Sequence, residues 1–213
     1  MRYIYKSEQS GRSMVEMLGV LAIVGVLSVG GIAGYSKAMA KFKNTKVMDQ
    51  ASMLIASTRM AYNGQTNFSG LTTVVAWDMG VASPEMMIEP VAGTRVLANV
   101  FAPTASSVFV NAATSAATPP VANGAMGVTF AMLPKDACTS LATTDWGRGS
   151  GFVGVIVETM ATPSATTASG NVPGATANTA AGFGIDNLPA APALAAQGCA
   201  GDLDNAVTLF FEP

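Results

Sequence analysis

The most marked pattern of apolar positions lies near the N-terminus. Residues 17–34 contain no charged side chain and a single hydroxyl, that of Ser28. Because a helix needs about 20 apolar residues to cross the hydrocarbon of a bilayer, this run predicts a transmembrane helix. It begins directly after Glu16, and a carboxylate at the edge of hydrocarbon is costly unless a cation meets it. Glu16 is therefore a candidate functional residue.

Beyond this run, apolar positions recur at helical spacing. Residues 35–63 contain neither proline nor glycine. Three- and four-residue steps connect Val47, Ala51, Leu54, Ile55, Thr58 and Tyr62, which predicts one apolar face. We expect one continuous helix ending at Asn63, with Gly64 as its C-terminal cap. From residue 12 to residue 63 it would be about 75 Å long.

The remaining residues, 64–213, predict a globular head built from short elements. The expected elements are a short helix from about Thr72, a helical turn after Ser83, strands at 95–101, 107–111, 126–133, 151–158 and 206–211, and a helix at 134–141. Residues 112–123 and 159–181 are rich in Ala, Thr, Ser, Gly, Asn and Pro, which is typical of exposed loops.

Composition removes most enzymatic chemistry. The 213 residues include no histidine, which excludes the commonest general base and the commonest metal ligand. The glycine-rich run at 147–151 precedes a predicted strand, whereas a phosphate-binding loop should follow a strand and open a helix; a hairpin connection is expected there instead. Asp202 and Asp204 lack the further oxygen ligands of a calcium loop. We expect no catalytic residue, cofactor, metal or specific nucleic-acid partner.

Charge is unevenly distributed although the net charge is only −2. A basic collar follows the apolar run, formed by Lys37, Lys41, Lys43 and Lys46, while the head is mainly acidic. The collar has two interpretations. Its lysines would either reach lipid head groups at the membrane interface or meet an acidic surface of a neighbouring copy. By charge counting alone, the orientation of the transmembrane helix is ambiguous.

The N-terminus resembles the class III leader of the type IV pilin family. A short basic peptide ends at Gly11, and Glu16 is the fifth residue after it. This resemblance implies that a prepilin peptidase cleaves between Gly11 and Arg12, that Arg12 is then methylated, and that Glu16 neutralises the N-terminal amine of a neighbouring subunit. It divides the chain into a leader (1–11), a transmembrane and assembly helix (12–34), an amphipathic helix (35–63) and a head (64–213).

Two features differ from most members of that family. Arg12 is charged rather than apolar, and its i, i+4 spacing would let Glu16 be satisfied partly within its own chain. Gly30, Gly31 and Gly34 occupy the half of the span where many pilins have a proline, so local softening of the helix on assembly is expected. A simple signal anchor, with Glu16 reaching the membrane interface, is the competing interpretation.

Two head segments resemble the type IVb branch. Residues 68–87 resemble its αβ-loop, and residues 133–141 resemble the helix that carries its first disulfide cysteine. The resemblance implies a Cys138–Cys199 bridge closing the C-terminal region 138–199. Two cysteines without histidine fall short of a zinc ligand set, whereas an exported chain favours one bridge. Closing a loop of this length contributes about 4 kcal/mol in the chain-entropy model.

The expected fold is therefore α+β, a pilin fold with a long N-terminal helix packed on an antiparallel sheet head. The resemblance implies a structural subunit of a type IVb-like pilus, a helical homo-oligomer supporting adhesion, aggregation, motility or DNA transfer. Its implied partners are the prepilin peptidase and an inner-membrane assembly platform. The head would be periplasmic before assembly and extracellular afterwards. The alternatives are a minor pilin that binds a surface or DNA, and a secretion pseudopilin.

Overall fold

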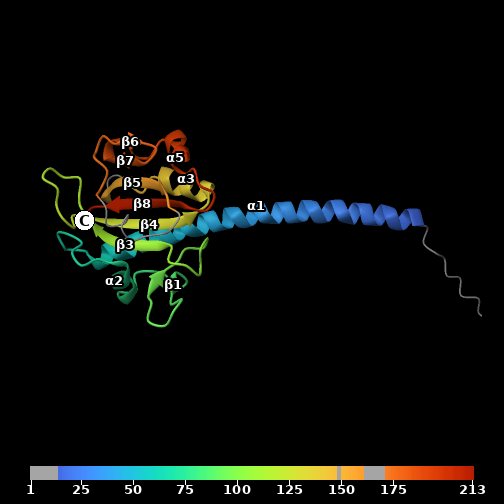
Figure 1. Cartoon of the computed structure of the whole chain (residues 1–213), viewed down its shortest axis with the longest axis horizontal. Coiled ribbons are helices and arrows are strands. Elements are labelled where there is room, and N and C mark those ends of the chain that lie inside the picture. The colour runs from blue at the N-terminus through green and yellow to red at the C-terminus, as the bar shows by residue number, and fades with distance from the viewer. Residues whose placement is uncertain (1–13, 148–149, 161–170) are drawn as a thin grey trace, which may run out of the picture. The chain divides into compact units, whose positions relative to one another are not determined.

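The computed structural model describes residues 14–147, 150–160 and 171–213 (Figure 1). Its elements are α1 (Met14–Ala61), α2 (Thr73–Asp78), β1 (Met87–Ile88), β2 (Val96–Leu97), β3 (Val108–Ala113), β4 (Ala125–Leu133), α3 (Lys135–Thr143), β5 (Phe152–Thr159), β6 (Asn178–Thr179), β7 (Gly182–Gly184), η2 (Ile185–Asn187), α5 (Pro192–Gly198) and β8 (Asn205–Phe211). Contacts divide the chain after Phe42 into two units. The second unit, residues 43–213, consists of the last part of α1 and the predicted head. From here on, this whole unit is called the head.

The long helix predicted from the sequence is confirmed. α1 is helical from Met14 to Ala61 without interruption, including Gly30, Gly31 and Gly34. It ends two residues before the predicted Asn63. Gly64 then has a φ of +85°, the left-handed conformation that ends many helices because glycine adopts it without a Cβ clash.

The head contains an antiparallel sheet in the order β1-β2-β3-β4-β8-β5-β7-β6. Every pairing between its named strands is antiparallel. β8 lies between β4 and β5, and Leu209 is opposite Val128 on one side and Val155 on the other. The strand formed by residues 205–211 is therefore the centre of the sheet rather than its edge (Figure 1).

The main core of the head brings the second half of α1 together with the sheet. The stripe predicted on this helix is buried at Val47, Ala51, Leu54, Ile55 and Thr58, and Tyr62 is partly buried. Its apolar members share one cluster with sheet side chains, among them Val110, Val128, Phe130, Val155, Val207, Leu209 and Phe211. Because each strand alternates its side chains between two faces, one face of the sheet packs on this helix.

Of three expectations for the first part of the head, two need correction, while the turn after Ser83 is present. The strand expected at 95–101 is only Val96–Leu97, because residues 99–105 form turns organised by the buried Asn99, whose Oδ1 accepts from the Phe101 N–H at 2.8 Å. The helical turn expected after Ser83 is a single turn closed by the Met86 N–H and the Ser83 carbonyl at 2.9 Å. The loop expected from residue 112 begins later, since β3 continues to Ala113.

The glycine-rich run at 147–151 connects α3 to β5, so it is a helix-to-strand connection and not the expected hairpin. Within the segment expected to be loop at 159–181, the structure contains β6, while residues 161–170 lie outside the described part. The sequence pattern also missed β7, η2 and α5. β7 is Gly-Phe-Gly, with low strand propensity, and it forms because Phe183 pairs with Val155 and is fully buried.

Candidate functional site

The first part of α1 presents apolar side chains on all sides. In the described residues, α1 is the one helix long and apolar enough to cross a membrane, with a best 18-residue window of mean hydropathy 2.2 and none of that window buried. Leu21, Ile23 and Val26 are 63–76% exposed. A helix that is apolar all round is normally surrounded by lipid or by other helices. This surface therefore needs a cover that residues 14–42 do not supply themselves.

The polar groups of this surface are few and mostly satisfied within the helix. Ser28 donates its hydroxyl hydrogen bond to the Val24 carbonyl at 2.7 Å, and Ser36 donates to the Ile32 carbonyl at 3.0 Å. Such bonds allow a hydroxyl to enter hydrocarbon without an unpaired donor. Glu16, exposed in the first turn of α1, is the one carboxylate in the described residues up to Phe42.

Of the residues predicted for leader cleavage, methylation and charge pairing, Glu16 lies in the described part of the chain. Glu16 lies where the aligned peptide dipoles favour a negative charge, an effect of about 0.3–1 kcal/mol at an exposed site. Gly11 and Arg12, the predicted cleavage and methylation positions, lie outside the described residues.

Glycines along this part of α1 leave open space. A Cβ built on Gly19, Gly25, Gly30, Gly31 or Gly34 meets no atom within 4 Å. Nothing inside the described chain therefore requires glycine at these positions. In membranes, small residues on a helix surface let another helix approach closely. The glycines are thus compatible with close packing against a second helix.

The second half of α1 carries polar anchors for the head. Lys46 Nζ lies 2.8 Å from Glu85 Oε2, and the amide of Gln50 donates to Glu85 Oε1 at 3.3 Å. The hydrogen bond from Lys46 lowers the pKa of Glu85 below its ordinary value. This contact joins the helix to residues 83–87. Sequence reasoning did not pair Lys46 with Glu85, because nothing in their spacing signals the contact.

Part of the predicted basic collar is thus engaged within the head. Besides the Lys46–Glu85 pair, Lys43 Nζ lies 5.8 Å from the centre of the Phe101 ring, within cation–π distance. Asn44, between them, donates to Asp136 of α3 at 2.7 Å. The interpretation that all four collar lysines face lipid or a neighbour is therefore too broad, since Lys43 and Lys46 contact their own chain.

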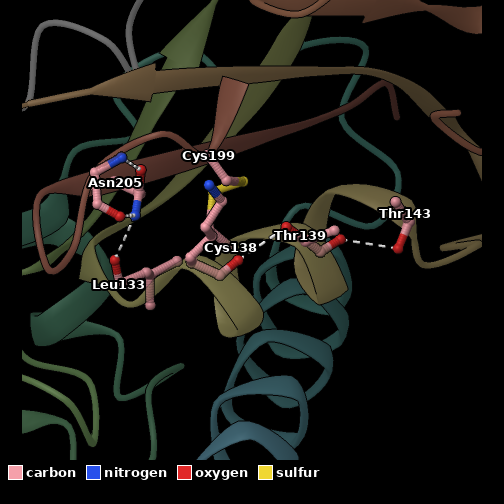
Figure 2. The surroundings of a disulfide bond; sticks show 8 residues. Leu133, Cys138, Thr139, Thr143, Cys199 and Asn205 are labelled. Carbon is pink, nitrogen blue, oxygen red and sulfur yellow. Dashed lines mark hydrogen bonds between the residues drawn. A yellow bond between two sulfur atoms is a disulfide. The ribbon is translucent and has the colours of Figure 1, made fainter. Parts of the chain in front are cut away.

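The Cys138–Cys199 disulfide is present, as predicted. Figure 2 shows Cys138 on α3 bonded to Cys199, which follows α5, with Cα atoms 5.9 Å apart and the two cysteines 61 positions apart in sequence. Both cysteines are fully buried. Nearby, the buried Asn205 donates to the carbonyls of Leu133 and Gly201 at 2.9 and 2.7 Å. The bridge and Asn205 together fix the segment that leads into β8.

Among the described residues, no group of three or more His, Cys, Asp or Glu side chains is arranged to hold a metal. What the arrangement offers is association through apolar surface. Its elements are an apolar helix with a first-turn carboxylate and a disulfide-closed head.

Comparisons with known proteins give one family match and similar solved structures. The bundlin family model matches residues 38–187. Among solved structures, the chain is similar to the type IVb pilin from Salmonella typhi, at a TM-score of 0.50 and 15% identity over 79% of this chain and 99% of that one. It is also similar to TcpA, a type IV pilin from the Vibrio cholerae El Tor biotype. The TM-score is 0.44 and the sequence identity is 15%, over 79% of this chain and 98% of that one. No curated protein sequence matches.

Proposed function

This chain belongs to the bundlin family of type IVb pilins, and from that premise we propose that it is a structural subunit of a type IVb-like pilus that polymerises through its N-terminal helix. The proposed sections are a leader (1–11), a transmembrane and assembly helix (12–34), an amphipathic helix (35–63) and the remainder of the head (64–213). Family and fold support a pilus subunit and give no support to an enzyme. The individual assembly steps belong to the same proposal.

Before assembly, the helix is held in the inner membrane with the head on the periplasmic side. A prepilin peptidase cleaves between Gly11 and Arg12, and the new amine of Arg12 is methylated. The exposed apolar surface of α1 supports this stage, because it equals a membrane span in length and hydropathy. Ser28 and Ser36, bonded to their own helix, add no unpaired donor to the hydrocarbon.

During assembly, an inner-membrane platform transfers the helix from lipid into a bundle of identical helices. Apolar surface replaces lipid, and Glu16 pairs with the N-terminal amine of the adjacent subunit. The observation that carries the proposal is Glu16 itself: a lone carboxylate in the first turn of a helix whose following side chains are apolar and exposed. A charge in that position is costly until a cation meets it. The finished pilus is extracellular and supports adhesion, aggregation, motility or DNA transfer.

The test is the variant Glu16→Gln, which keeps the size of the side chain and removes its charge. We expect normal leader removal, seen by N-terminal mass analysis, and a fall in sheared fibre yield of more than about tenfold, because breaking a desolvated charge pair costs about 3–5 kcal/mol. The matched control is Glu89→Gln, the same change at an exposed head position. An unchanged fibre yield in Glu16→Gln would refute the pairing role.

A further inference from the structure

Two adjoining hollows lie at the end of the head where α1 stops, and the assembly proposal uses neither. The first has a volume of about 270 Å³ and is lined by residues that include Arg59, Tyr62, Asn63, Gln65 and Pro213. The second, of about 420 Å³, is lined by Thr66, Ser115, Val121, Glu212 and again Pro213. Because both share Pro213 and the chain passes from Gln65 to Thr66, they adjoin. Together they offer room for a ligand larger than a single small ion.

Arg59 supplies a cation to the first hollow. Its Cζ atom lies 6.0 Å from the centre of the Phe211 ring. Within the part of the chain that the structure describes, Arg59 takes part in no ion pair. Its position in the last turn of α1 complements the helix dipole. That role needs only a positive charge, and it leaves the planar donor face of the guanidinium available to an anion.

The space beside this guanidinium is kept open by Gly151. This residue has a φ of +84°, and a Cβ built on it would lie 3.0 Å from Nη2 of Arg59 and 2.6 Å from the Glu212 carbonyl oxygen. The Glu212 N–H in turn donates to the Gly151 carbonyl at 2.8 Å. A side chain at position 151 would therefore displace Arg59 or the C-terminal segment. The backbone at Gly151 thus lies directly beside the guanidinium.

Apart from Glu212, which lines the second hollow only, the polar side chains named around the hollows besides Arg59 are neutral hydrogen-bonding groups beside an aromatic ring. Asn63 and Gln65 contribute amides that both donate and accept, and Thr66 adds a hydroxyl. Tyr62 packs against Phe68 with ring centres 5.4 Å apart, and burial raises the pKa of its phenol, so it stays a neutral donor and acceptor. Amides, hydroxyls and a ring face complement a polyhydroxylated ligand, and an arginine complements a carboxylate on it.

We propose that the two hollows form a binding groove for a carboxylated saccharide, with its carboxylate on Arg59 and its hydroxyls on Asn63, Gln65 and Thr66. This function goes beyond polymerisation and does not depend on it, because every residue involved lies in the head. The groove gives a subunit a ligand-binding surface whether or not Glu16 acts in assembly.

The experiment titrates the full-length chain in detergent micelles with methyl β-D-glucuronide and, separately, methyl β-D-glucoside, which differ in one carboxylate. Backbone NMR shifts should change saturably at residues 62–66 with the glucuronide. The glucoside should bind at least about tenfold more weakly, because it lacks the carboxylate that accepts charge-assisted hydrogen bonds from Arg59. Arg59→Gln should abolish this difference, and Arg59→Lys should reduce it, since lysine keeps the charge and loses the two-pronged geometry.

The matched control is Lys135→Gln, which removes the same charge from an exposed head position at the start of α3 and should leave both affinities unchanged. Asn63→Ala should weaken both sugars without altering their ratio. Equal affinities for the two sugars, or a glucuronide response that survives in Arg59→Gln, would overturn the groove. Acetate that shifts residues 62–66 at the same concentration as the glucuronide would overturn the saccharide and leave only an anion contact. Loss of fibres in Glu16→Gln bears on neither result.

Discussion

The two parts of α1, residues 14–42 and residues 43–61, are continuous in secondary structure but differ in what surrounds them. Leu21, Ile23 and Val26 are 63–76% exposed in the first part, whereas Val47, Ala51 and Leu54 are 0% exposed in the second. Both parts are rich in apolar residues. Helix formation itself therefore does not distinguish them. The difference is whether the chain contains its own partner for the apolar surface.

This contrast shows that the distribution of apolar side chains around a helix determines what covers them. In residues 43–61 the apolar side chains form one stripe, and charged residues such as Lys46 and Asp49 leave that face to the head core. In residues 17–34 no face is polar. The apolar face of an amphipathic helix is covered by the head of its own chain. A helix that is apolar on all sides has to be covered by lipid or by other copies.

The largest effect is expected from removing the bridge that closes the head. In the double variant Cys138→Ala/Cys199→Ala, the free energy of unfolding of the head should fall by about 4 kcal/mol, because a 61-residue separation is no longer constrained in the unfolded state. Trp77 and Trp146 both lie in the head, so their fluorescence in guanidinium titrations reports its unfolding. At guanidinium concentrations below that transition, the far-UV circular dichroism signal of α1 should be unchanged. A loss below about 1 kcal/mol would contradict the chain-entropy account.

The next effect compares the same substitution in the two parts of α1. Leu54→Ala should destabilise the head by about 3 kcal/mol, since it removes a fully buried side chain and leaves a cavity. Leu21→Ala changes an exposed side chain and should alter head unfolding by less than about 0.5 kcal/mol. Both are measured by the same tryptophan titration. Similar losses from the two variants would mean that the contrast between the two parts is false.

The smallest effect concerns the Lys46–Glu85 anchor and depends on pH. Lys46 lowers the folded-state pKa of Glu85 below its ordinary value of 4.5. The contribution of the pair is therefore fully present above pH 4.5 and is lost as the pH falls through the lowered pKa of the folded state. Because both side chains are more than a third exposed, we expect only about 0.2–1 kcal/mol.

The measurement for this prediction is head stability at about pH 6 and about pH 3 in the native chain and in Glu85→Gln, well above and below the ordinary carboxyl range. Glu85→Gln should remove part of the pH dependence, whereas the exposed control Glu89→Gln should leave it unchanged. Identical pH profiles for the native chain and Glu85→Gln would exclude a role for the anchor.

Much of the fold could be predicted from the sequence where the pattern is long. The long helix and its buried stripe are present, and the strands expected at 126–133, 151–158 and 206–211 are found within one residue at each end. The Cys138–Cys199 bridge, expected from family resemblance, is also present. The short elements were not. β1, β6 and β7 are two or three residues long, too short for any periodicity, and they exist only through pairing with neighbours.

The candidate site could be predicted only in part, for a related reason. Glu16 is conspicuous because every following side chain up to Gly34 is uncharged, so local sequence is enough to identify it. Gln50 is buried on the same helix face as Val47 and Leu54, but a glutamine interrupts an apolar pattern and was not included. Likewise, Arg59 and Gly151 are 92 positions apart, and only the folded chain brings a guanidinium beside that glycine.

The place of β8 in the sheet has a consequence for the order in which the strands can pair during folding. β4 and β5 are separated until residues 205–211 arrive between them, although both precede those residues in the sequence. Until residues 205–211 pair with both strands, the inner edges of β4 and β5 have no strand between them, and the pairing of β4 with β8 is non-local in sequence and therefore intrinsically slow. A copy that lacked residues 205–211 would leave the inner edges of β4 and β5 unpaired, so this strand is what joins the two parts of the sheet.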